Sequence, residues 1–68
     1  MDEQPIADAR ANLSEIAAQV RLLRKVVMLT RRGKAQAAIV PAELAEAVEE
    51  AGGPDKATEL LRQAKGAK

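Results

Sequence analysis

Hydrophobic and polar positions follow two different spacings along this chain. Between residues 8 and 22, apolar side chains recur every three or four positions, which places them on one face of a helix. Residues 26–30 (VVMLT) are instead a short run of apolar and β-branched residues, which is typical of a strand. The pattern therefore predicts a helix over residues 8–22, with Asp8 as its N-cap, and a strand over residues 26–30.

A second strand is expected directly after the first. Residues 31–34 read RRGK, and the glycine supplies the positive φ that a tight turn needs. Residues 35–40 end in isoleucine and valine, although the three alanines before them are weak strand formers. Two apolar runs joined by a short glycine-containing turn predict a β-hairpin.

A short leading strand and two further helices complete the predicted order. Residues 5–7 favour an edge strand, because proline is tolerated where a strand begins. Residues 42–51 are rich in alanine, leucine and glutamate, and the glycine pair at 52–53 ends that helix. Pro54 opens a final helix that runs to about residue 65. We therefore expect an α+β domain: short N-terminal strand, helix, β-hairpin, then two helices.

The chain has little material for a core. It has 68 residues, and 15 of its 32 apolar residues are alanine, with no aromatic residue at all. Domains below roughly 70–80 residues usually add disulfides, a metal or oligomerisation to a core of this size. The absence of Cys and His removes disulfides and the commonest metal ligands. We therefore expect self-association, with no metal and no cofactor.

The hairpin offers apolar residues on both faces, more than one helix can cover. The residues that we assign to a homodimer interface share one of these faces: Val27, Leu29 and Ile39. An ordinary monomer core would also bury them. Apolar residues on both faces of the hairpin, in so small a chain, favour a sheet that is covered by a second copy of the chain.

Charge is unevenly distributed, although the net charge is only +1. Residues 10–34 hold seven cations and one acid, giving +6, whereas residues 41–68 hold four cations and six acids, giving −2. A cationic surface of this kind attracts the phosphates of duplex DNA, and the alternative is a run of charges that meets only water. The residues that would make such a contact with DNA are Arg10, Asn12, Arg31, Arg32 and Lys34.

Arg10 and Asn12 are expected near the start of the first helix, where backbone N–H groups and the helix dipole attract phosphate. Guanidinium and amide groups can also pair with the edges of guanine and adenine. The alternative is that Arg10 pairs with Asp8 or Glu15, while Asn12 bonds to the backbone locally. Sequence chemistry alone leaves both alternatives open.

The final helix carries a thin apolar stripe behind a Gly-Gly-Pro break. A helix of about 12 residues is marginal alone in water. It therefore folds back onto its own domain or a dimer mate, or it orders on a partner protein. The residues that would make this contact are Ala57, Leu60, Leu61, Arg62 and Ala64.

Enzymatic chemistry has poor support in this sequence. The hydroxyl nucleophiles are Ser14, Thr30 and Thr58, and there is no His to activate them. The longest apolar run has four residues, far short of the roughly 20 that span a bilayer. The acidic, polar start of the chain does not resemble a secretory signal. We expect a cytoplasmic binding protein that is not an enzyme and has no membrane contact.

Several of these segments, taken in order, resemble the Phd/YefM antitoxins of bacterial type II toxin–antitoxin systems. The matching segments are ARANLSE at 9–15, VVMLT at 26–30, RRGK at 31–34 and IVP at 39–41. The family pattern is close to A-R-x-N-L-S-E, then V-x-I-T-R-R-G-K-P, then A-x-L-V-P. One departure is LLRK at 22–25, where a Gly-Glu-Pro-like turn is usual, so the first helix could end differently.

The resemblance implies two functional parts. Residues 1–51 would form a domain that dimerises through its sheet and helices and binds double-stranded operator DNA. Residues 52–68 would bind a cognate toxin protein and would be flexible when unbound. The implied function is an antitoxin that neutralises its toxin and represses its own operon. A repressor without a toxin, and a toxin inhibitor without DNA binding, are the alternatives.

Overall fold

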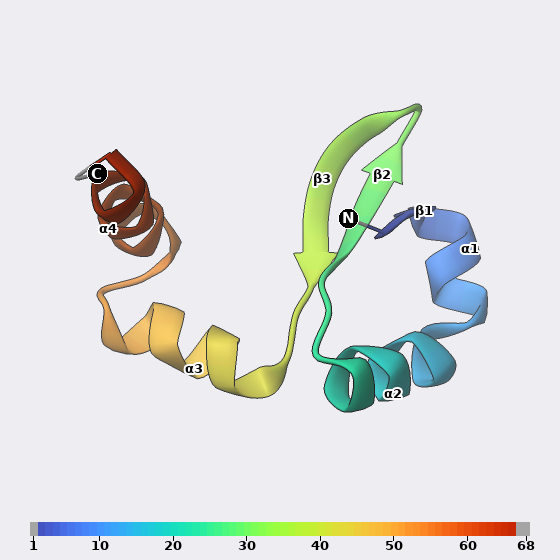
Figure 1. Cartoon of the computed structure of the whole chain (residues 1–68). Helices are drawn as coiled ribbons and strands as arrows, with labels where there is room; N and C mark the ends of the chain where they lie inside the picture. Colours follow the sequence, from blue (N-terminus) through green and yellow to red (C-terminus); the bar gives the residue numbers. More distant parts are fainter. Residues whose placement is uncertain (1, 67–68) are drawn as a thin grey trace.

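The computed structural model describes residues 2–66, which form a three-stranded sheet and four helices (Figure 1). The elements in chain order are β1 (Asp2–Pro5), α1 (Ile6–Ala11), α2 (Leu13–Leu23), β2 (Val27–Arg31), β3 (Lys34–Ile39), α3 (Ala42–Glu50) and α4 (Pro54–Gly66). The predicted α+β class is therefore confirmed. No helix in this part of the chain is long and apolar enough to cross a lipid bilayer.

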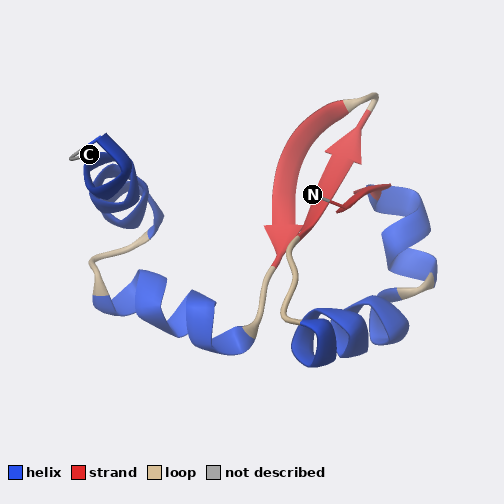
Figure 2. Cartoon of the chain, in the orientation of Figure 1, coloured by secondary structure: helices blue, strands red, loops and turns tan. Residues whose placement is uncertain are grey.

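β2 is the central strand of the sheet, with β1 on one side and β3 on the other (Figure 2). β1 runs parallel to β2 and places Asp2 opposite Val27. β3 runs antiparallel to β2 and places Ile39 opposite Val27. The buried hydroxyl of Thr30 donates a hydrogen bond to the carbonyl oxygen of Gln4 at 3.4 Å, which ties β2 to β1.

The first strand begins earlier than predicted, at residues 2–5 instead of 5–7. Pro5 is its last residue, with φ −60° and ψ 144°. This extended conformation also makes it the residue that precedes α1, which begins at Ile6. Asp8 consequently lies in the first turn of α1, so the prediction that it caps the helix is wrong.

The single helix predicted over residues 8–22 is also wrong, because the chain breaks at Asn12. Asn12 has φ −122° and ψ 26°, and its backbone N–H donates to the carbonyl of Ala9 at 3.2 Å. Its side-chain amide donates to the carbonyl of Asp8, also at 3.2 Å. Local bonds of this kind compete with a continuous helix. α2 then runs to Leu23 and ends with Arg24 in the left-handed conformation (φ 55°).

The core lies between the two N-terminal helices and one face of the sheet. Its fully buried members are Ala9 of α1, Ile16 and Val20 of α2, and Val27 of β2. Leu29 and Ile39 are partly buried against this cluster. The three residues predicted at a dimer interface therefore pack within the single chain, and Val27, 1% exposed, keeps almost no surface for a second copy.

α3 and α4 form an arm that extends away from this core (Figure 1). They pack against each other, and α3 contains no buried residue. The guanidinium of Arg24 donates to the carboxylate of Glu43 at 2.7 Å, which joins the end of α2 to the start of α3. The radius of gyration is 13.3 Å, whereas a compact chain of this length has about 11 Å. The arm therefore does not close over the sheet.

Val27→Ala should lower the free energy of unfolding by about 2 kcal/mol, because it removes two methyl groups from a fully buried position. Urea titration followed by circular dichroism at 222 nm measures this, since the chain has no tryptophan. The control is Leu13→Ala, at a side chain that is 53% exposed. Equal destabilisation by the two variants would contradict the core described here.

Candidate nucleic-acid interface

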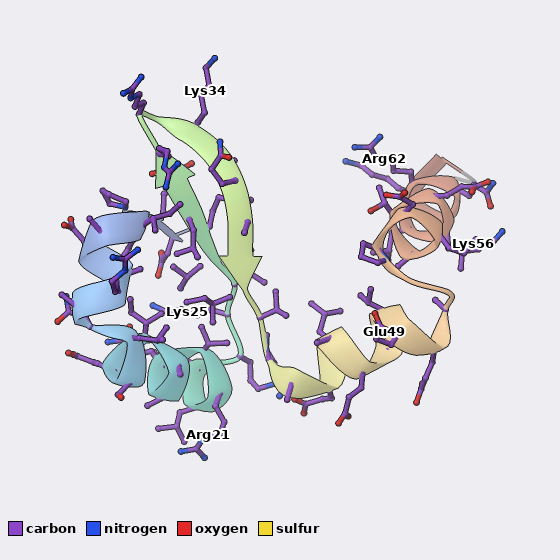
Figure 3. The ribbon with its side chains drawn as sticks, turned by 180° about the vertical axis from the view of Figure 1, so that it is seen from behind. Arg21, Lys25, Lys34, Glu49, Lys56 and Arg62 are labelled. Atoms are coloured by element: carbon purple, nitrogen blue, oxygen red, sulfur yellow. The ribbon has the colours of Figure 1, made fainter. Side chains whose placement is uncertain are left out.

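Four of the five residues predicted to contact DNA lie at one end of the molecule. Arg10, Arg31 and Arg32 line one open hollow beside the start of α1. Arg31, Arg32 and Lys34 line a second hollow at the tip of the hairpin. Figure 3 shows Lys34 projecting from this tip, away from the helices. We call these four residues the basic patch.

The tight turn between β2 and β3 crowds three of these cations together. Arg32 and Gly33 have φ values of 53° and 78°, and a two-residue hairpin turn of type I′ requires positive φ at both positions. The turn places Arg31 directly opposite Lys34. Side chains at opposite positions lie on the same face, and like charges in such a pair destabilise a hairpin. The tip therefore has an electrostatic repulsion that a bound anion would relieve.

The basic patch is free of acidic partners within residues 2–66. All four side chains are exposed, and the ion pairs found in that range involve other cations. Arg10 in particular does not pair with Asp8 or Glu15, which was the alternative to DNA contact. Four positive charges therefore face solvent without neutralisation at this end of the molecule.

The position of Arg10 in its helix differs from the prediction. It lies in the last turn of α1, which begins at Ile6 and ends at Ala11, and it precedes the start of α2 at Leu13 by three residues. Asn12 directly precedes α2 and lines a separate hollow with Arg10. Its side-chain amide already donates a hydrogen bond to the carbonyl of Asp8. The structure thus brings Arg10 to the hairpin and leaves Asn12 beside the patch.

Two other cations are neutralised, and both lie away from the patch. The ammonium of Lys25 donates to the carboxylate of Asp2 at 2.6 Å, and this hydrogen bond lowers the pKa of Asp2 below its usual 3.8. The pKa of Glu43 is lowered by a hydrogen bond from its own backbone N–H and then by Arg24. These pairs join β1 and α3 to Lys25 and Arg24, which follow the end of α2.

Gln36 was not predicted as a site residue, yet it lines the hollow at the hairpin tip with three of the patch cations. Leu29 lies opposite Ala37, whereas Thr30 lies opposite Ala35, so Gln36 is an extra residue in β3. A β-bulge of this kind changes the direction of a side chain. The signal available in the sequence was a polar residue at a position that an unbroken hairpin would turn toward the core.

The residues predicted for toxin binding lie in the arm. Ala57 is buried, whereas Leu60 and Leu61 are 44% and 66% exposed. These three residues line an apolar groove between α4 and α3, together with Leu44 and Val48. Arg62 and Ala64 are exposed on α4, where Figure 3 labels Arg62. The stripe is therefore partly covered by α3 and partly open.

Comparison of the chain with protein-family models, curated proteins and solved structures finds no match in any of the three. The charges and exposed apolar side chains of the basic patch and the arm are therefore the structural guide to function.

The Lys25–Asp2 pair predicts a loss of stability in acid. Because the pKa of Asp2 is lowered on folding, its contribution is present above 3.8 and is lost as the pH falls through the lowered value. Thermal melts between about pH 5 and pH 3 should show a steeper fall for the wild type than for Asp2→Asn. The difference should be small, since the pair is exposed.

Glu3→Gln is the matched control for this comparison, because Glu3 is a neighbouring exposed acid outside the ion pairs found in residues 2–66. It should keep the pH dependence of the wild type. If Asp2→Asn also keeps it, the ion pair does not form in solution.

Proposed function

We propose that this chain is an antitoxin that binds operator DNA as a homodimer, represses its own operon and neutralises a cognate toxin by direct contact. The observation that carries the DNA-binding half is the basic patch, with four exposed cations at one end of the molecule. The phosphates of duplex DNA supply the anions that would relieve the repulsion between Arg31 and Lys34. The resemblance to Phd/YefM antitoxins supports the same conclusion from the sequence.

The homodimer is supported by the small core and the open arm. The chain leaves Leu22 and Leu23 of α2 about two-thirds exposed. Within residues 2–66, β3 pairs with β2 alone, so its other edge is available to another strand. Leu29 and Ile39 are only partly buried and keep surface for a second copy. A two-fold dimer would present two basic patches, as the half-sites of a palindromic operator require.

The toxin-binding half rests on the arm and on the family resemblance. An amphipathic helix can lay its apolar face in a groove of a partner protein. Leu60 and Leu61 expose the apolar surface for such a contact, while Ala57 is already buried. Arg62 and Ala64 would then lie at the edge of the interface. A repressor without a toxin, or an inhibitor without DNA binding, would retain only one of the two halves.

Charge reversal at the hairpin tip tests the DNA-binding half. Arg31→Glu/Arg32→Glu should weaken binding to the duplex directly upstream of the chain's own reading frame by at least 100-fold, because several phosphate contacts are lost. Fluorescence anisotropy with a labelled duplex at two salt concentrations measures the change. Binding to the product of the adjacent toxin gene should stay within a few-fold of the wild type.

The matched control is Arg21→Glu/Lys56→Glu, which changes the net charge equally at exposed sites outside the patch. Figure 3 labels both residues, on α2 and α4. This variant should keep most of its affinity for DNA. An equal loss in the two variants would mean that overall charge, and not the hairpin tip, determines binding.

Substitution of the open leucines tests the toxin-binding half. Leu60→Ser/Leu61→Ser should abolish inhibition of the toxin and leave DNA binding unchanged, because it removes the exposed apolar contact on α4. Co-purification with the toxin and growth rescue on co-expression measure this, with Lys56→Ser/Lys65→Ser as the control on the same helix. Full toxin inhibition by the leucine variant would remove α4 from the proposed interface.

A further inference from the structure

The bulge in β3 determines which residues of this strand reach the core. Without it, the register set by the turn would continue and would place Gln36 opposite Leu29, on the face covered by the helices. A glutamine amide buried there would lose its hydration. The same register would turn Ile39 to the other face, because a shift of one residue reverses every side chain.

The observed register avoids both outcomes. Ile39 lies opposite Val27 and packs against the core, while Gln36 is left without a partner residue in β2. The extra residue therefore keeps the core apolar and moves one polar side chain away from it. A β-bulge commonly serves to direct a side chain in this way.

Gln36 lies beside the cations of the hairpin tip. Gln36 is exposed and lines the hollow at the hairpin tip together with Arg31, Arg32 and Lys34. It is the uncharged member of that group. Within residues 2–66 its amide forms no side-chain hydrogen bond, unlike those of Asn12 and Gln63. Its donor and its acceptor are therefore both free for a ligand.

The chemistry of this amide differs from that of its cationic neighbours. Cations that contact phosphates fix a protein on the duplex but do not distinguish sequences. A glutamine amide instead presents a donor and an acceptor side by side, which match N7 and the N6 amino group of adenine in the major groove. A two-stranded ribbon such as this hairpin is also narrow enough to enter that groove.

We propose that Gln36 is a specificity-determining residue, which selects an A·T pair in the major groove while the basic patch holds the flanking phosphates. This inference rests on the proposed DNA-binding function and adds the residue that sets its sequence preference. The observation that supports it is the position of Gln36: its free side-chain amide lies at the bulge, within a group of cations.

Selection from a library of random-sequence duplexes tests the inference with the full-length chain. Wild type should enrich a motif that contains a preferred A·T pair, and Gln36→Ala should enrich the same motif with that position degenerate. Affinity for the wild-type motif should fall about tenfold, as for the loss of one bidentate base contact. The salt dependence of binding should stay unchanged, because glutamine carries no charge that displaces counterions from DNA.

Two further variants separate base recognition from a structural role. Gln36→Arg should change the preference at the same position from A·T to G·C, because arginine pairs with the guanine edge. Gln63→Ala, at an amide on α4 outside the patch, should enrich the wild-type motif. Circular dichroism of each variant confirms that the chain is folded.

The outcomes distinguish the inference from the function on which it rests. If Gln36→Ala and Gln36→Arg enrich the unchanged wild-type motif, Gln36 does not read a base and the inference is overturned, while DNA binding stands. If Gln36→Ala weakens binding to all sequences equally, Gln36 is only a backbone contact and the inference is overturned. If the folded wild type binds no duplex at about 50 mM salt, the proposed function fails and the inference fails with it.

Discussion

Burial of Val27 between the sheet and the two N-terminal helices determines how this chain folds. The cluster around it has few members, and each nearby element contributes one or two of them. α1 supplies Ala9, α2 supplies Ile16 and Val20, and β3 supplies Ile39. With no aromatic residue available, a loss of one contact removes a large part of the core. The bulge at Gln36 is a local irregularity that lets Ile39 reach this cluster.

The same shortage explains why the arm remains open. Among the described residues, α3 contains no buried residue, and α3 and α4 line a shared apolar groove. Leucines on α2 and α4 consequently keep between 44% and 66% of their surface in water. Complete burial of such a side chain stabilises a protein by about 2 kcal/mol. Association with a second copy or with another protein is the route by which this chain can gain that burial.

The sequence predicted the features that depend on neighbouring residues and missed those that depend on the rest of the fold. The hairpin and the grouping of Arg31, Arg32 and Lys34 follow from a four-residue turn, so both were accessible. The helix break was not, because the buried positions Ala9, Ile16 and Val20 keep a helical spacing across it. The approach of Arg10 to the hairpin is a tertiary contact without a local signal. The bulge was hidden because alanine, which is compatible with either face, occupies half of β3.

The ion pairs found in residues 2–66 lie at junctions between elements and not at the hairpin tip. Lys25 and Arg24 each lie against a carboxylate at such a junction. The hairpin tip has the opposite arrangement, because Arg31 lies opposite Lys34 and Arg32 adopts a left-handed conformation that costs a non-glycine residue about 1 kcal/mol. In a domain stabilised by only a few kcal/mol, these costs are large. A bound anion would relieve the repulsion between Arg31 and Lys34, whereas the conformation of Arg32 is required by the tight turn itself.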